Sequence, residues 1–170
     1  MLNDEVVMPV TTPEGEEWSA QAPALDSVDR DIISVLAQDG RISMTALAET
    51  VHISRAHCHA RLQRLQRTGV ITGFTVNVDP LKMGFGASAH VILKLRQHNW
   101  RALRQQLLDI PEVWHVTLTG GPMDVILLVR AKDTADLRRV VFDEIQPLAG
   151  VVDTQTFMIF DDQVSRSALH

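Results

Sequence analysis

Apolar side chains recur every three to four residues in the first half of the chain and every second residue in much of the second half. From Asp26 onward, Val28, Ile32 and Leu36 fall on one face of a helix. Asp26 is a suitable N-cap for this helix and Gly40 a suitable end. The first element of the chain is therefore predicted to be an amphipathic helix.

Two further helices are predicted directly after it. A short one begins near Ser43 and buries Leu47 and Val51. A turn at residues 52–53 separates it from a third helix, which Ser54 can cap and which runs to about residue 68. On the third helix the spacing i, i+4, i+7 predicts a buried stripe, made of Cys58, Leu62 and Leu65. Gly69 closes this helix.

Residues 70–78 read as a strand, and Asp79-Pro80 as a break that opens a linker over 79–86. The rest alternates strands with helices. Strands are predicted at 87–96, 113–119, 123–131 and 151–160, and helices from Asn99 and from Asp133 or Thr134. The order β-α-β-β-α-β is the split βαβ, or ferredoxin-like, arrangement.

That arrangement places both helices on one face of its sheet and predicts an uncovered second face. In the last strand both alternating sets of side chains contain large apolar residues, for example Phe157 and Met158. An exposed apolar surface of this kind usually marks association. We expect a dimer formed through the sheets; the alternative is that the acidic tail or the linker covers this face.

Charge is unevenly distributed along the 170 residues, whose formal net charge is −5. Residues 1–29 carry seven acids and no Lys or Arg, whereas residues 54–68 carry four Arg and no acid. The acidic segment 1–24 and the segment 164–170 are predicted to be tails, the first of them disordered. No apolar run reaches the roughly 20 residues of a membrane span, and one cysteine cannot form an internal disulfide. We expect a cytoplasmic protein.

The segment HISRAHCHARLQRLQRTG, residues 52–69, raises two alternatives, a metal site and a nucleic-acid surface. His57 and His59 lie about 200° apart on a helix, and Cys58 lies on the buried stripe, so these side chains cannot share one ion. Zinc sites also require a second ligand pair, and the chain has no CxxC or HxxxH. The pattern therefore does not predict a metal site.

Two short helices joined by a tight turn are typical of a helix-turn-helix, whose second helix enters the major groove of DNA. Arg can contact guanine, and Ser or His can contact base or phosphate. Arginines further along the helix can reach the phosphate backbone. The alternative is a solvated basic face, although such faces more often mix the two signs of charge. The candidate DNA-binding residues are Ser43, Ser54, Arg55, His57, His59, Arg61, Arg64 and Arg67.

Residues 25–163 resemble the Lrp/AsnC family, the leucine-responsive and feast/famine regulators. The matching features include Leu25-Asp26, Asp29, Gly40-Arg41-Ile42-Ser43, Leu47-Ala48, Ser54, Arg61-Leu62, Leu65, Gly69-Val70-Ile71 and Asp79-Pro80. The family usually has Gly in the turn where this chain has His52, a residue that tolerates positive φ better than most. We expect an α+β protein with an N-terminal winged helix-turn-helix domain at 25–78 and a ferredoxin-like βαββαβ effector-binding domain at 87–163.

The resemblance implies a prokaryotic transcription regulator that binds double-stranded DNA, assembles as dimers and often as a ring of four dimers, and binds an amino acid or related metabolite between dimers. The family's G-x-x-D signature is matched at residues 121–124. The candidate effector residues are Gly120, Gly121, Met123 and Asp124, with Thr134, Thr154 and Thr156 as weaker neighbours. Gly-Gly-Pro is also simply a turn, in which Asp124 can bond backbone amides. Met123 favours an apolar or sulfur-containing amino acid.

Two other function classes stay open. Some tetrapyrrole decarboxylases resemble the same two-domain family and use histidines, and His90 and His115 are the candidates here. A metal-responsive regulator built on the histidine and cysteine cluster is the other. No catalytic triad, P-loop or reactive cysteine context is present, so we expect no enzyme, no metal and no cofactor.

Overall fold

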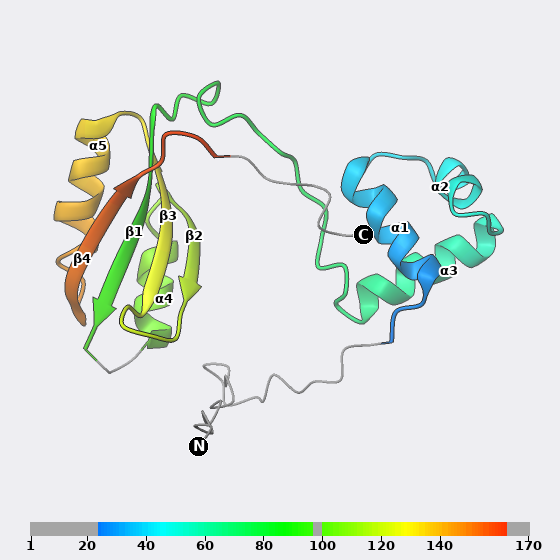
Figure 1. Ribbon diagram of the computed structural model, residues 1–170, viewed down its shortest axis with the longest axis horizontal. Helices are drawn as coiled ribbons and strands as arrows, with labels where there is room; N and C mark the ends of the chain where they lie inside the picture. The colour runs from blue at the N-terminus through cyan, green and yellow to red at the C-terminus, as the bar shows by residue number, and fades with distance from the viewer. Residues whose placement is uncertain (1–23, 97–99, 163–170) are drawn as a thin grey trace, which may run out of the picture. The chain divides into compact units, whose positions relative to one another are not determined.

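The computed structural model describes residues 24–96 and 100–162. They form two compact units, which meet in the chain between Asn77 and Val78 (Figure 1). The predicted N-terminal tail up to residue 23, the cap at Asn99 and the C-terminal tail lie outside the described residues.

Three helices make up the first unit: α1 (Ser27–Gln38), α2 (Met44–Thr50) and α3 (Arg55–Arg67). Their buried core consists of Ile32, Leu47, Ala48, Val51, Cys58 and Leu65. The predicted stripe on the third helix is confirmed at Cys58 and Leu65, while Leu62 is half-buried at its edge. The helical spacing read from the sequence thus identifies the faces that pack together.

Side chains cap each of these helices where the sequence predicts. Asp26 Oδ1 accepts from the backbone N–H of Asp29 at 2.9 Å, and the Asp29 side chain accepts in return from the Asp26 N–H, which completes a capping box. Ser43 caps α2 and Ser54 caps α3. Because all three caps are formed, the ends of the short helices are fixed by local sequence.

The turn between α2 and α3 has the backbone geometry that the sequence predicts. His52 has φ 55°, and it is the one non-glycine residue with positive φ in the described chain. Its N–H donates to Glu49 O, and the N–H of Ile53 donates to Ala48 O. A left-handed residue at this point ends α2 and redirects the chain into α3.

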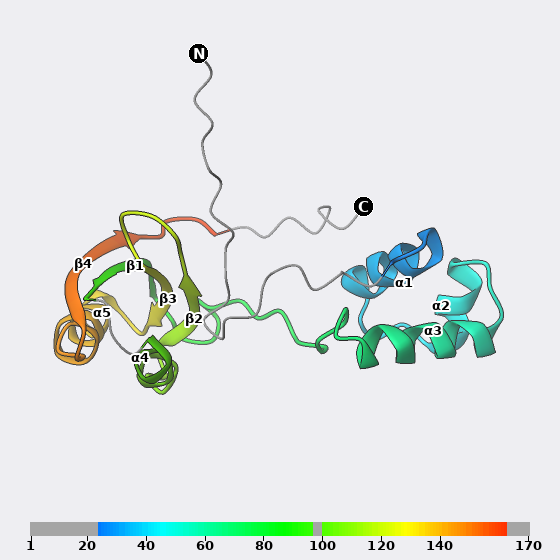
Figure 2. The ribbon, with the colours of Figure 1, turned by 90° about the horizontal axis from the view of Figure 1, so that it is seen from below.

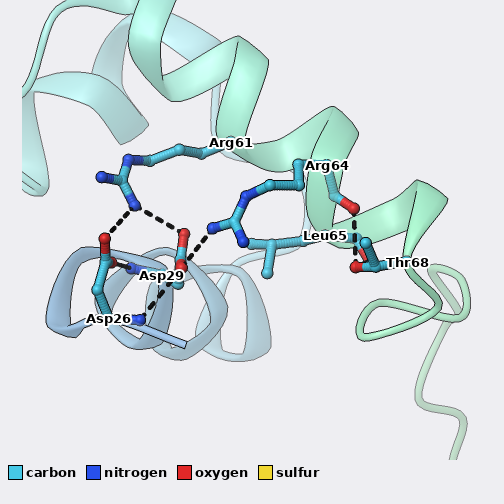
Figure 3. A network of polar contacts seen from close by, with 6 residues as sticks. All are labelled: Asp26, Asp29, Arg61, Arg64, Leu65 and Thr68. Carbon is cyan, nitrogen blue, oxygen red and sulfur yellow. Dashed lines mark hydrogen bonds and ion pairs between the residues drawn. The ribbon is translucent and has the colours of Figure 1, made fainter. Parts of the chain in front are cut away.

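The side of α3 that faces α1 is held by ion pairs (Figure 3). Arg61 Nη1 lies 2.6 Å from Asp26 Oδ2 and 2.9 Å from Asp29 Oδ1, and Arg64 Nη2 lies 2.5 Å from Asp29 Oδ2. The side chain of Asp29 is only 1% exposed, whereas the two arginines keep about a third of theirs exposed. Asp29 is therefore a buried carboxylate shared by two guanidinium groups, and it fixes the position of α3 on α1.

Burial of Asp29 works to raise its pKa, but the hydrogen bonds from Arg64 and Arg61 and from the Asp26 backbone outweigh burial and hold the pKa below its ordinary value. The stabilisation that a carboxylate gains in this way is fully present above its unfolded pKa of about 3.9. It is lost as the pH falls through the lower pKa of the folded protein.

The second unit is a four-stranded antiparallel sheet with two helices. The strands are β1 (Ala87–Leu95), β2 (Val113–Leu118), β3 (Val125–Ala131) and β4 (Val151–Met158), and their spatial order is β2-β3-β1-β4. The helices are α4 (Trp100–Leu108) and α5 (Thr134–Arg139), with Asp133 as the N-cap of α5, and α5 continues into the π-helical turn η1 (Val140–Ile145). The predicted βαββαβ order is confirmed.

Both helices lie on the same side of the sheet (Figure 2). Alternate residues of β1 and β3, such as Val91 and Leu127, point to that side and are fully buried with Leu107 of α4. Gly86 leads into β1, where an added Cβ would lie 2.7 Å from Lys132 O, so only glycine fits. Among the described residues of this unit, no helix covers the opposite face of the sheet (Figure 2).

One predicted strand is wrong. Residues 72–79 have no regular secondary structure, and among the described residues they pair with no strand. Apolar and polar side chains do alternate along this segment, but neither set is buried, and Phe74, Val76 and Val78 are all exposed by at least 41%. Alternation favours a strand only where a partner strand supplies the hydrogen bonds, and the described chain supplies none.

Replacing His52 by Gly should stabilise the first unit by about 0.5–1 kcal/mol, because glycine adopts positive φ without steric cost. In hydrogen exchange followed by mass spectrometry, peptides from α2 and α3 should exchange about two to five times more slowly. His52→Ala keeps a Cβ and should give no such protection. Equal protection in both variants would contradict a strained turn.

Replacing Asp29 by Asn should destabilise the first unit by about 2 kcal/mol, because two charged hydrogen bonds lose their carboxylate. Peptides from α3 should then exchange about 30 times faster at pH 7. Asp31→Asn makes the same chemical change at an exposed position of the same helix and should leave exchange within about twofold.

The cost of Asp29→Asn should also depend on pH. It should stay constant from pH 7 to about pH 5 and shrink below about pH 4, where the unfolded chain takes up a proton that the native carboxylate, with its lowered pKa, does not yet bind. Circular dichroism of urea unfolding at a series of pH values measures this difference. A cost unchanged at pH 3 would show that the ionised form is not what stabilises the unit.

Candidate nucleic-acid interface and effector site

The exposed surface of α3 carries arginine and histidine side chains from its first residue onward. Arg55, His57, His59 and Arg67 are all exposed, and Arg55 and His59 share one face at spacing i, i+4. Arg55 and Arg67 make no ion pair with any described residue. Their guanidinium groups therefore retain all their donors for an anionic partner.

The hydroxyl groups of the two candidate serines are already engaged. Ser43 Oγ accepts from Ala46 N at 3.1 Å, and Ser54 Oγ accepts from His57 N at 3.3 Å. Both hydroxyls still have their own hydrogen to donate, and both residues are exposed. Their first role is to begin α2 and α3, and a contact with DNA would use the remaining O–H.

The other two candidate arginines point inward rather than outward. Arg61 and Arg64 contact carboxylates of α1, as described above, and the pairing raises the pKa of Arg61. Each has five N–H donors and about a third of its side chain exposed, so donors remain for a phosphate. The structure shows their contacts with Asp26 and Asp29. Their contact with phosphate stays a prediction.

The histidines and the cysteine of α3 are not arranged around a common point. Cys58 is fully buried, and burial raises the pKa of its thiol, which disfavours the thiolate that binds metals. Within residues 24–96 and 100–162, no group of three or more His, Cys, Asp or Glu side chains could hold a metal ion.

Four of the candidate effector residues lie together in the hairpin between β2 and β3. Gly121 has φ 134°, a conformation that favours glycine, and an added Cβ at Gly120 or Gly121 would meet no atom within 4 Å. Thr119 closes the hairpin, since its Oγ1 donates to Met123 O at 2.9 Å. The backbone of the two glycines is thus open to the close approach of a small molecule.

Asp124, at the end of this hairpin, is already bonded within the sheet. Its carboxylate accepts from Leu95 N at 2.8 Å, and Lys94 Nζ lies 3.1 Å from Asp124 Oδ2. The hydrogen bond from Leu95 N is the main reason that its pKa is lowered, and Lys94 adds to this effect. The carboxylate is therefore charged and half-buried, with one edge tied to β1.

The three threonines are more widely spread. Thr154 lies opposite Leu93 on the outer strand β4, and it accepts from Gln146 Nε2 at 2.6 Å. Thr156 is exposed two residues further along β4. Thr134 begins α5 at the other end of β3 from Asp124, a distance of about 20 Å for seven residues of strand. One copy of the chain does not bring Thr134 together with the hairpin.

His90 and His115 lie on the uncovered face of the sheet. Each is opposite Leu128 of β3, His90 from β1 and His115 from β2, so they flank the same leucine. Phe157 of β4 is opposite His90 on the other side. The histidines therefore belong to a broad face rather than to an enclosed site.

This uncovered face has an apolar centre, made of Ile92, Ile126, Leu128 and Phe157, of which Phe157 is 52% exposed. At one edge Trp114 packs edge-to-face on Phe85, with ring centroids 5.2 Å apart, and the guanidinium of Arg130 lies 5.1 Å from the Trp114 ring. Monomeric soluble proteins rarely expose a contiguous apolar surface of this kind to water.

Two contacts in these sites are not predicted by the sequence. One joins Asp29 to Arg61 and Arg64, and the other joins Lys94 to Asp124. Both contacts join residues at least 29 positions apart. The only sequence signal was the run of arginines without acidic neighbours, which requires carboxylates from another element.

The described residues contain no helix long and apolar enough to cross a membrane. Two family models match the chain. A winged helix-turn-helix DNA-binding model matches residues 25–72, and an Lrp/AsnC ligand binding domain model matches residues 88–169. The two matches fall on the helical unit and on the sheet unit respectively.

Relatives and solved structures agree with this division. HTH-type transcriptional regulator AldR of Mycolicibacterium smegmatis is 39% identical over 155 residues, which is 89% of this chain and 90% of the relative. A proline dehydrogenase transcriptional activator of Rhizobium radiobacter is 34% identical over 79% of this chain and 88% of the relative.

The crystal structure of MtbAldR has a TM-score of 0.74 at 35% identity and covers 86% of this chain and 99% of its own. A transcriptional regulator of Neisseria meningitidis, solved as a complex with L-Met, has a TM-score of 0.76 at 23% identity, over 85% of this chain and 96% of its own, and shows the fold alone. The relatives are transcriptional regulators, and the chain belongs to the Lrp/AsnC family of such regulators.

Proposed function

We propose that this regulator reads DNA with the N-terminal end of α3 and that an amino acid bound at the β2–β3 hairpin changes its assembly and its affinity for DNA. The observation that carries the first part is the position of Arg55. It is exposed, makes no ion pair with any described residue, and stands at the first turn of the second helix of a helix-turn-helix.

The contacts of the four arginines of α3 indicate different roles for them. Arg55 and His59, which share one face of α3, are proposed to contact base edges together with the serine hydroxyls. His57 lies about 200° from His59 around the helix, so its proposed contact is with phosphate. Arg67, at the far end of α3, is placed to contact phosphate. Arg61 and Arg64 hold α3 on α1, and their exposed donors add phosphate contacts of secondary importance.

The effector is proposed to be an amino acid held by the open backbone of Gly120 and Gly121, with Met123 and Asp124 beside it. Asp124 keeps its charge, so its outer edge can pair with an α-ammonium group. Met123 favours an apolar or sulfur-containing side chain, and the L-Met complex of the Neisseria neighbour is compatible with that choice. Thr154 and Thr156 are the nearer threonines, and Thr134 would have to come from another copy.

The functional unit is proposed to be a dimer formed through the uncovered sheet faces, with four dimers in a ring. The apolar centre of that face supports this assembly, and so do the exposed side chains of Phe74, Val76 and Val78. An effector bound between dimers would favour one assembly only if it binds the two assemblies with different affinity. A protein that acts on the chromosome in this way is expected in the cytoplasm.

The first test is a fluorescence-anisotropy titration with a duplex from upstream of the protein's own gene and with a scrambled duplex. At about 0.15 M salt, non-specific binding is weak, and a preference of about 10³ or more identifies a sequence-specific regulator. No preference for any sequence, even after selection from random duplexes with amino acids present, would refute the proposal.

Arg55→Ala should reduce affinity for the specific duplex by about 1–3 kcal/mol and relax sequence preference, whereas Arg67→Ala should weaken all duplexes similarly and reduce the salt slope by about one. Arg104→Ala removes an exposed arginine from the sheet unit and should change neither. If Arg55→Ala lowers affinity for specific and scrambled duplexes equally, Arg55 does not read bases.

Gly120→Val should abolish most effector binding without unfolding the hairpin, because Gly120 has ordinary φ and its added side chain would fill open space. Calorimetric titration with individual amino acids should show an affinity loss of about tenfold or more. Gly73→Val is the matched control, since an added Cβ there also meets no atom within 4 Å, and it lies in the other unit.

Light scattering on the same samples gives the mass of the assembly with and without the amino acid. Unchanged affinity in Gly120→Val would place the effector elsewhere. A saturating amino acid that changes neither the mass nor the affinity for DNA would contradict the proposed coupling.

A further inference from the structure

A groove of about 570 Å³ lies between the start of α1 and one side of α3. It is lined on one side by Ala24 and Asp26 and on the other by His57, Ala60, Arg61 and Arg64. Ala24 is the first described residue of the chain. The N-terminal segment therefore joins the helical unit at the groove, beside the helix that is proposed to read DNA.

The charges of α3 outside the groove and of the N-terminal segment are complementary. In the groove, the carboxylates of Asp26 and Asp29 are already paired with Arg61 and Arg64. Along the rest of α3, Arg55, Arg67 and two exposed histidines have no acid beside them in the sequence. Residues 1–23 contain no Lys or Arg and carry these acids: Asp4, Glu5, Glu14, Glu16 and Glu17.

The acidic run at residues 14–17 is close enough in the chain to reach all of α3. Ala24 lies seven positions after Glu17. An extended chain spans at most about 3.3–3.6 Å per position, or roughly 24 Å in all. The 13 residues of α3 extend over about 20 Å. No part of α3 is therefore beyond the reach of Glu17 by chain length.

We propose that the acidic run at residues 14–17 of this chain docks in the groove and along α3, where it competes with DNA phosphate. Single exposed ion pairs are weak, but tethering gives the run a millimolar effective concentration at α3. Such a competitor opposes non-specific DNA, which is held by phosphate contacts alone, more than a specific site, which adds base contacts. The docked run would thus increase the discrimination of the regulator.

The test compares the full chain with two variants that change the net charge equally, from −5 to −3. Glu16→Gln with Glu17→Gln removes charges from the run, and Asp109→Asn with Asp143→Asn removes exposed charges from the sheet unit. The first variant should bind a random duplex about three to ten times more tightly at 0.05 M salt, and the difference should vanish near 0.3 M. The second variant should resemble the native chain.

A readout without DNA separates this proposal from that of DNA binding itself. His57 lines the groove and His59 does not, so diethyl pyrocarbonate modification of His57 relative to His59 reports on occupation of the groove. The ratio should rise in Glu16→Gln with Glu17→Gln and stay unchanged in the control variant. An unchanged ratio, or equal gains in DNA affinity in both variants, would overturn the proposal.

Discussion

A buried carboxylate with two arginines around it is the contact on which the DNA-binding unit depends. The helix α3 carries four arginines and no acid, so nothing within it balances their charge. Asp29 is 1% exposed and takes a hydrogen bond from each of two of these arginines. A charge removed from water needs such partners, and removing one partner of a buried pair is strongly destabilising. Arg61 and Arg64 therefore stabilise the helical unit, and Arg55 and Arg67 remain available for an external anion.

The second unit depends on a different constraint: helices cover only one face of its sheet. Because α4 and α5 lie on one face (Figure 2), the alternate residues of the central strands β1 and β3 divide into a buried set and a set that faces away. The outward set is apolar at its centre and polar only in part. The proposal of a dimer rests on this uncovered face of the sheet rather than on any one residue.

A net charge of −5 is compatible with DNA binding because phosphate responds to the local potential of α3, not to the total charge of the chain. Five of the 21 acidic residues lie in residues 1–23, and this segment joins the helical unit beside α3. Because the chain tethers these acids near the basic helix, they affect the local potential at α3 more than a distant acidic surface would.

The sequence alone determined the elements, their order and their caps, because these depend on neighbours three or four residues away or on alternation along a strand. Asp26, Ser43 and Ser54 cap the helices as predicted, and His52 adopts the positive φ of its turn. The strand predicted at 70–78 failed because pairing requires a partner that periodicity does not report. Only the tertiary structure decided that Arg61 and Arg64 turn toward Asp29 and that Asp124 is tied to Leu95 and Lys94. Those contacts join residues about 30 positions apart, and only the folded chain brings them together.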